Sequence, residues 1–329
     1  MWQNKAYQCN VFCEMPLKSD QKKRADRNRT LIINEHEHEV LEKKLLVVGA
    51  INLRKKEILN KVILGDIYDV LDKLPDNFAD LIVLDPPYNL TKNFHGFHFN
   101  SSSDDDYLVY LRSWFPKVIS KLKPTGSVYL CGDWKCTSML QKVMSEHLTV
   151  LNRITWQREK GRGASKNWKN GMEDIWYGVM NPKDYYFDVT AVKIKRRVKA
   201  PYKENGIPKD WQETSEGKFR ITYPSNFWDD ISVPYWSMPE NTDHPTQKPE
   251  KLIAKLILAS CPLDGVVFDP FLGSGTTAVT AKKLGRKFVG IEMNEEYAIW
   301  AEKRIQMAER NRSIQGFEEG VFWERNSGK

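Results

Sequence analysis

Four consecutive residues, Asp85-Pro86-Pro87-Tyr88, carry groups that could hold a flat amino compound. They follow a predicted strand, Ala79 to Leu84, whose continuous apolar run from Leu81 to Leu84 is typical of a strand buried on both faces. Because the prolines fix φ, the Asp85 carboxylate and the Pro86 carbonyl form two hydrogen-bond acceptors at a set separation, with the Tyr88 ring beside them. A planar amino group with two N–H donors would suit this set. The same residues could also form a strand-ending turn in which Asp85 caps and Tyr88 packs.

A second group, Phe268 to Thr277 (FDPFLGSGTT), has the composition of a ligand-binding turn between a strand and a helix. No Lys follows the second Gly, so it is not a Walker loop, and Ala278 weakens a dinucleotide interpretation. Glu292 ends the next predicted strand, 23 residues after Asp269, where an acidic side chain binds both hydroxyls of a ribose. The pattern indicates a cofactor that contains a nucleoside and needs no pyrophosphate site.

Both groups are positioned by a predicted α/β fold, a doubly wound and mostly parallel sheet. Strands are predicted at 62–64, 79–84, 127–131, 150–156, 266–269 and 287–292, and helices at 67–74, 104–122, 134–147, 249–260, 275–284 and 294–310. This alternation is typical of parallel sheets with helices on both faces. Such sheets bind ligands at the carboxyl ends of their strands, where both groups lie.

Five segments are predicted along the 329 residues. An N-terminal arm (1–57) precedes the first half of a catalytic domain (58–156), which includes a polar loop from Asn89 to Ser103. An insertion (157–243) breaks the alternation with mixed Gly, Pro, aromatic and Lys residues, and the second half of the domain (244–311) is followed by a polar tail (312–329). The length suits two domains, or one domain with an insertion.

Composition excludes a membrane span and a wholly disordered chain, since apolar residues make up 41%, charged residues 28%, and apolar runs are short. No apolar segment follows Met1, so we expect a cytoplasmic protein without a secretory signal. The five cysteines have no zinc or redox spacing and are expected to be reduced packing residues. His36 to Glu39 alternates His and Glu without a further ligand set, so no metal is predicted.

The net charge of +7 is concentrated in residues 151–220, which hold 16 Lys and Arg against 9 Asp and Glu, together with ten aromatic residues. This stretch suits a polyanion whose bases or sugars also need contacts. A solvated, Lys-rich face would have the same composition.

Taken in order, the motifs resemble those of the β class of DNA amino-methyltransferases, which use S-adenosylmethionine. The resemblance covers about 61–310 and rests on Leu64-Gly65-Asp66, the Asp85 tetrad, His244-Pro245-Thr246-Gln247-Lys248-Pro249 and the turn from Asp269 to Thr277. It implies a class I methyltransferase fold, Rossmann-like with a circularly permuted motif order. It also makes 157–243 the target recognition region.

The resemblance assigns residues to two roles, and the local excess of positive charge indicates a third, contact with DNA. Asp85, Pro86, Pro87 and Tyr88 are implied to be catalytic. The cofactor residues are Asp66 at the adenine ring, Glu292 at the ribose, Asp269, Phe271, Gly273 and Gly275 along the methionine part, His244, Thr246 and Lys248 near its end, and Pro270, Ser274, Thr276 and Thr277 in the same turn. The residues expected to contact DNA are Lys193, Lys195, Arg196, Arg197 and Lys199, with Arg158, Arg162 and Lys166 upstream.

The expected reaction is methylation of adenine N6 in double-stranded DNA, because cytosine enzymes of this family commonly begin the tetrad with Ser. The base would be extruded and stacked on Tyr88, while Asp85 and the Pro86 carbonyl accept hydrogen bonds from the two N6–H groups. DNA is the expected partner; a homodimer and a cognate restriction endonuclease are possible partners, and a membrane is not expected.

Several alternatives stay open. An N4-cytosine methyltransferase would share every motif, whereas a protein glutamine methyltransferase would begin the tetrad with Asn. Intact Asp85 and Asp269 argue against an inactive DNA-binding module, and the incomplete dinucleotide turn argues against a nicotinamide oxidoreductase. A C5-cytosine enzyme needs a nucleophilic Cys, but Cys261, at a predicted helix end, is expected to be structural.

Overall fold

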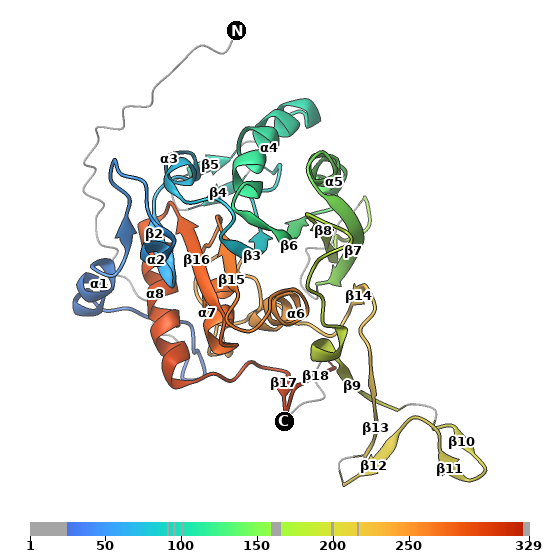
Figure 1. Ribbon diagram of the computed structural model, residues 1–329. Coiled ribbons are helices and arrows are strands. Elements are labelled where there is room, and N and C mark those ends of the chain that lie inside the picture. The colour runs from blue at the N-terminus through green and yellow to red at the C-terminus, as the bar shows by residue number, and fades with distance from the viewer. Residues whose placement is uncertain are drawn as a thin grey trace.

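A computed structural model describes residues 25–90, 92–94, 97–99, 102–158, 166–198, 201–215 and 217–324. Its centre is a nine-stranded sheet (Figure 1). The strands, in spatial order, are β1 (Leu46–Val47), β2 (Lys61–Leu64), β16 (Lys287–Glu292), β15 (Val266–Asp269), β3 (Ala79–Leu84), β6 (Leu122–Gly132), β8 (Met172–Val179), β7 (Thr149–Gln157) and β14 (Phe227–Trp228).

The sheet is mostly parallel, which confirms the predicted fold class. Neighbouring strands from β1 to β6 run in the same direction, and only β8 is antiparallel to both of its neighbours. The later strands β15 and β16 lie between β2 and β3, so the two halves of the chain interleave. Their contact at β15 and β3 brings the two predicted motifs together at adjacent strand ends.

Helices cover both faces of the sheet. One core cluster includes side chains of α1 (Glu35–Glu42), α6 (Glu250–Ser260), α7 (Thr276–Lys283) and α8 (Glu295–Arg310). The other includes side chains of α2 (Lys55–Ile58), α3 (Ile67–Val70), α4 (Asp104–Ile119) and α5 (Thr137–Ser145), together with the 3₁₀ helix η1 (Leu71–Lys73). Within β3, Leu81 and Val83 pack in the first cluster, whereas Ile82 and Leu84 pack in the second. The unbroken apolar run of this strand reflects burial on both faces.

A second sheet has five strands and lies beside α6 (Figure 1). Its order is β12 (Gln212–Thr214), β13 (Gly217–Thr222), β9 (Ile194–Arg197), β18 (Val321–Trp323) and β17 (Phe317–Glu318). The 3₁₀ helix η2 (Val189–Val192) precedes β9, and a small hairpin of β10 (Lys203–Glu204) and β11 (Ile207–Pro208) extends away from the body in Figure 1.

Several predicted boundaries are wrong. Residues 172–179, predicted as insertion, form β8 of the central sheet, and part of the predicted arm forms β1 beside β2. The predicted polar tail contains β18, because Phe322 is buried against Ile194 and supplies an apolar anchor. The predicted polar loop at 89–103 includes the hairpin of β4 (Lys92–Phe94) and β5 (Phe97–Phe99). The predicted helix 104–122 ends at Ile119 because β6 begins at Leu122.

The other sequence features have structural roles. Glu37 of the His-Glu segment caps α1 and pairs with Lys303 of α8. Cys131, Cys136 and Cys261 are free, buried thiols, as predicted, while Cys9 and Cys13 lie outside the described residues. Among the described helices, none has the length and apolar composition needed to cross a bilayer.

Candidate active site

Acidic side chains follow the carboxyl ends of five neighbouring strands. In the order β2, β16, β15, β3 and β6 these residues are Asp66, Glu292, Asp269, Asp85 and Asp133. The antiparallel strand β8 adds Glu173 at the same edge, because Asp174, next to it, pairs with Gly132 at the end of β6. One edge of the sheet therefore collects carboxylates from both halves of the chain.

The tetrad forms a compact hydrogen-bonded cluster at the end of β3. The Tyr88 hydroxyl donates to Asp85 Oδ1 at 2.7 Å, and the Tyr107 hydroxyl of α4 donates to the Pro87 carbonyl at 2.9 Å. Loss of water around the Tyr88 hydroxyl, reinforced by Asp85 and Glu173, raises the pKa of Tyr88 well above its usual value. Tyr88 therefore acts as a neutral donor and an aromatic surface.

Lys248 contacts the tetrad directly. Its Nζ donates to Asp85 Oδ2 at 2.6 Å and lies 3.2 Å from the Tyr88 hydroxyl oxygen, and its place near the methionine end of the cofactor stays a prediction. Burial by itself would lower the pKa of Lys248, but the nearby carboxylates Asp85 and Glu173 outweigh it and raise that pKa. Lys248 is thus a buried cation of the tetrad.

Glu173 and Arg158 complete this cluster. Glu173 Oε2 lies 3.3 Å from Lys248 Nζ, and Glu173 Oε1 pairs with the Arg158 guanidinium. The Glu173 side chain is 5% exposed. The sequence analysis missed Glu173 because it placed residues 172–179 in the insertion rather than in the sheet.

The cofactor turn begins with Asp269, which is buried at the end of β15. Its Oδ1 accepts from the Phe271 amide at 2.9 Å, and the Thr277 hydroxyl also hydrogen-bonds to the carboxyl group. Burial, opposed by these hydrogen bonds, raises the pKa of Asp269 to about 7. A cation placed beside Asp269 would stabilise its charged form.

Glu292 supports the same turn from β16. Its Oε2 accepts from the Gly273 amide at 2.7 Å and its Oε1 from the Asn294 amide at 2.9 Å. Gly273 has φ +55°, and a Cβ there would lie 3.1 Å from His244 Nε2, so the turn packs closely against the His244 ring. Burial raises the pKa of Glu292 as well.

Close packing of two helices explains why residue 275 is a glycine. A Cβ at this position would lie 2.5 Å from the Ala301 Cβ of α8, and its φ of +87° is left-handed. The absence of a side chain therefore lets α8 approach the start of α7, and a cofactor contact of Gly275 stays a prediction.

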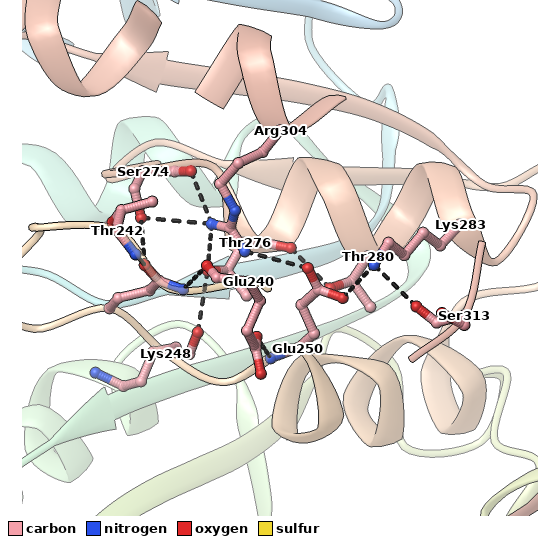
Figure 2. Close-up of polar contacts among 11 residues, drawn as sticks. Glu240, Thr242, Lys248, Glu250, Ser274, Thr276, Thr280, Lys283, Arg304 and Ser313 are labelled. Atoms are coloured by element: carbon pink, nitrogen blue, oxygen red, sulfur yellow. Dashed lines mark hydrogen bonds and ion pairs between the residues drawn. The ribbon is translucent and has the colours of Figure 1, made fainter. Parts of the chain in front are cut away.

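A buried polar network fixes the segment 244–248 against this turn (Figure 2). Arg304 donates to the Ser274 carbonyl at 2.8 Å and to Thr276 Oγ1 at 3.0 Å, and Thr276 in turn donates to the Lys248 carbonyl at 3.0 Å. Arg304 also reaches Glu250 Oε1 at 3.2 Å. The backbone of Lys248 is therefore held on the cofactor side, while Figure 2 shows its side chain pointing away from the network.

The two motifs share one cavity of about 30 Å³. Its lining includes Asp85 together with the predicted cofactor residues His244, Thr246, Lys248, Asp269, Phe271, Gly273, Ser274, Thr276 and Thr277. A larger hollow of about 230 Å³ lies near the amino ends of β3, β15 and β16, lined in part by Asp80, Val266 and Lys287. Since sheets of this type bind ligands at the carboxyl ends, we assign the site to the smaller cavity.

The other predicted cofactor residues lie close by. Asp66 caps α3 by accepting from the Tyr68 amide at 2.9 Å, beside the paired strand ends of β2 and β16. Phe271 packs its ring against Trp114 at 4.9 Å between centroids. Pro270 joins Asp269 to Phe271. Cofactor contacts of these residues stay predictions.

The predicted DNA-contact residues fall into different environments. Arg158 is paired with the buried Glu173, and Arg196 is half-buried with its Nε 4.0 Å from a Glu324 oxygen. Lys195 lies over the Trp323 ring at 4.0 Å, Arg197 is exposed, and Lys193 lies over the Tyr223 ring at 5.4 Å. The run is thus part of a sheet rather than a free loop, because the chain's C-terminal strand β18 pairs beside it. Lys166 is exposed, and Arg162 and Lys199 lie outside the described residues.

Cys261 has the environment of a packing residue. It is fully buried after α6, away from the cavity lining, and burial raises the pKa of its thiol to about 12. A nucleophilic thiol needs the opposite shift.

Comparison with known proteins agrees with this geometry. The family model N6_N4_Mtase, described as "DNA methylase", matches residues 79–303. The "DNA adenine methyltransferase YhdJ" of Escherichia coli (strain K12) is 33% identical over 253 residues, which cover 75% of this chain and 83% of the relative.

Two solved structures show the same fold. A structure titled as an M1.HpyAVI–SAM complex has a TM-score of 0.52 and 22% identity, and covers 74% of this chain and 98% of that chain. PvuII DNA methyltransferase, described as cytosine-N4-specific, has a TM-score of 0.56 and 16% identity, and covers 82% of this chain and 95% of that chain.

Proposed function

The chain belongs to the N6/N4 family of DNA methylases, and from that premise we propose that it methylates N6 of an adenine extruded from double-stranded DNA, using S-adenosylmethionine. The observation that carries the proposal is that Asp85 lines the cavity formed by the cofactor turn and accepts a hydrogen bond from Tyr88. The Asp at the start of the tetrad and the adenine specificity in the name of YhdJ both favour adenine.

The residues of the turn fit the cofactor. S-adenosylmethionine carries an electrophilic methyl group on a sulfonium, and it also carries an ammonium group. Asp269, a buried carboxyl with a pKa near 7, would gain from a nearby cation. Because the cavity holds about one water's share of volume, the nucleoside would extend along the strand ends towards Glu292 and Asp66.

The chain's own residues would activate the amine by orientation. Adenine N6 is a poor nucleophile because its lone pair is delocalised into the ring. Asp85 and the Pro86 carbonyl would accept hydrogen bonds from its two N–H groups, which favours sp³ geometry and directs the lone pair at the methyl carbon. S-adenosylmethionine would supply the methyl group for the new N–C bond, and its sulfur would keep the electron pair of the C–S bond. Asp85 then takes one N6 proton and passes it to water.

The test is analysis of nucleosides by mass spectrometry after incubation with S-adenosylmethionine and unmethylated genomic DNA. We expect N6-methyladenine with the wild type, and none with Asp85→Ala, which should bind the cofactor within about tenfold of wild type because Asp85 acts on the transition state. N4-methylcytosine as the product would instead make the chain a cytosine enzyme.

Sequencing that detects modified bases, on DNA from a host that expresses the protein, would define the recognised sequence. Double-stranded DNA is the proposed partner and the cytoplasm the proposed location. A homodimer and a cognate restriction endonuclease stay predictions from the sequence.

A further inference from the structure

Both carboxylate oxygens of Asp85 already have donors. Oδ1 accepts from the Tyr88 hydroxyl at 2.7 Å, and Oδ2 accepts from Lys248 Nζ at 2.6 Å. The proposed reaction needs an Asp85 oxygen directed at the target amine, and Tyr88 must also be able to turn its ring towards the base. Each carboxylate oxygen can accept a second hydrogen bond, but an Asp85 oxygen released by Lys248 or Tyr88 would bind the N–H groups of the target amine more strongly.

Both donors share one further acceptor. Glu173 Oε2 lies 3.4 Å from the Tyr88 hydroxyl and 3.3 Å from Lys248 Nζ. Since the Glu173 side chain is 5% exposed and that of Lys248 is 9% exposed, a short movement would transfer the ammonium between carboxylates without returning it to water. Such a transfer avoids the cost of leaving a buried charge unpaired.

We propose that Glu173 is a positioning residue for methyl transfer, which receives Lys248 and the Tyr88 hydroxyl when Asp85 turns to the target amine. This inference rests on the proposed function and deepens it. Glu173 does not touch the substrate in this scheme. It acts by releasing Asp85.

Arg158 holds Glu173 in place for this exchange. Its guanidinium pairs with Oε1 and so leaves Oε2 facing Lys248 and Tyr88. Two carboxylates, Asp85 and Glu173, are balanced by two cations, Lys248 and Arg158, so the exchange brings no net charge into the site. The carboxylates Asp85 and Glu173 raise the pKa of Lys248 in the arrangement seen in the structure, so its ammonium is charged there.

The substitution Glu173→Gln tests the proposal by weakening the second acceptor while keeping its shape. Lys248 and Tyr88 should then stay on Asp85. We expect kcat to fall by about 10- to 100-fold, the range for a lost charge-assisted hydrogen bond, with cofactor and DNA dissociation constants within about threefold of wild type. Asp174→Asn is the matched control, because Asp174 neighbours Glu173 on β8 but accepts from Thr155 at 2.9 Å; its kcat should be unchanged.

A double-mutant cycle with Lys248→Met separates positioning from simple structural support. If Glu173 acts through Lys248, Glu173→Gln should lower kcat much less in the Lys248→Met background than in the wild type. Equal losses in both backgrounds, or a wild-type kcat in Glu173→Gln, would overturn the proposal. If Glu173→Gln does not fold, Glu173→Asp can replace it, because it withdraws the carboxylate by one methylene. We expect the same fall in kcat and the same dependence on Lys248.

The test distinguishes this inference from the proposed function. Methyl incorporation is scored in every base, so an N4-cytosine product would refute the adenine assignment while the Glu173 comparison proceeds on cytosine. If the wild type transfers no methyl group, the same double-mutant cycle can be measured by thermal denaturation of the ligand-free variants. It then shows whether Glu173 and Lys248 interact in the folded protein. Independent effects of Glu173→Gln and Lys248→Met on the melting temperature would contradict the shared ion pair on which the inference rests.

Discussion

Substitution of Gly275 by Ala should destabilise the protein through the contact of α7 with α8. The new Cβ would lie 2.5 Å from the Ala301 Cβ and 2.7 Å from its Cα, and the backbone φ is +87°. A left-handed conformation costs a residue with a Cβ roughly 1–2 kcal/mol, and overpacking of a core adds roughly 1–3 kcal/mol. We therefore expect Gly275→Ala to lower the free energy of unfolding by roughly 2–5 kcal/mol.

Gly285→Ala provides the matched control. Gly285 also has a left-handed φ, +73°, but its Cβ would meet Leu263 at an ordinary 3.5 Å. This variant should lose only the backbone contribution of roughly 1–2 kcal/mol. Urea denaturation of both variants measures the difference, provided that the m-values agree.

Ala301→Gly should restore part of the stability of Gly275→Ala, because it removes the closest atom. If Gly275→Ala and Gly285→Ala are equally destabilised, α8 yields to the added methyl group. The packing account of Gly275 would then be refuted.

Three further outcomes are expected. Because burial raises the pKa of Asp269 to about 7, against about 3.9 in the unfolded chain, the Asp269 carboxyl binds an extra proton in the folded state between these values, so its contribution to the stability of the cofactor-free protein should fall as pH rises from about 4 to 7. Asp269→Asn should flatten this dependence in urea midpoints measured across that window, and an unchanged slope would assign it to another group. Tyr88→Ala should lower kcat/KM by the equivalent of roughly 1–3 kcal/mol through lost base stacking, and Tyr88→Phe by clearly less; equal losses would show that the hydroxyl, and not the ring, dominates. Replacing Lys195 and Arg197 by Gln should flatten the salt dependence of DNA affinity by up to about two units in fluorescence titrations, whereas no change in slope would mean that this face of β9 does not meet DNA.

The sequence predicted the elements whose pattern arises from burial in a parallel sheet. Residues 79–84 and 287–292 are strands with the predicted bounds, because both faces are covered and the apolar runs are unbroken. The ordered motifs also predicted that Asp85 and the Asp269 turn meet at one edge, and the direct pairing of β3 with β15 confirms that arrangement.

The rest depends on contacts distant in sequence. Glu173 is 85 residues from Tyr88, and only the antiparallel insertion of β8 beside β6 brings it to the tetrad. The motif around Lys248 predicted that this segment lies near the cofactor turn, but not that Thr276 holds its carbonyl while its ammonium reaches Asp85. Local composition predicts neither the contact of Thr276 with the Lys248 carbonyl nor the contact of the Lys248 ammonium with Asp85.

The pairing of β18 with β9 makes the predicted recognition region discontinuous in sequence. Lys251 of α6 donates to the Trp323 carbonyl of β18 and pairs at 3.0 Å with Asp230, which follows β14, so α6 ties β18 to the end of the predicted insertion. A chimaera that exchanges only strands β9 to β13 between relatives would leave the new β9 paired with the β18 of the original protein. We expect a transfer of specificity between relatives to need strands β9 to β13 together with residues 314–324, while β8 with Glu173 stays with the central sheet.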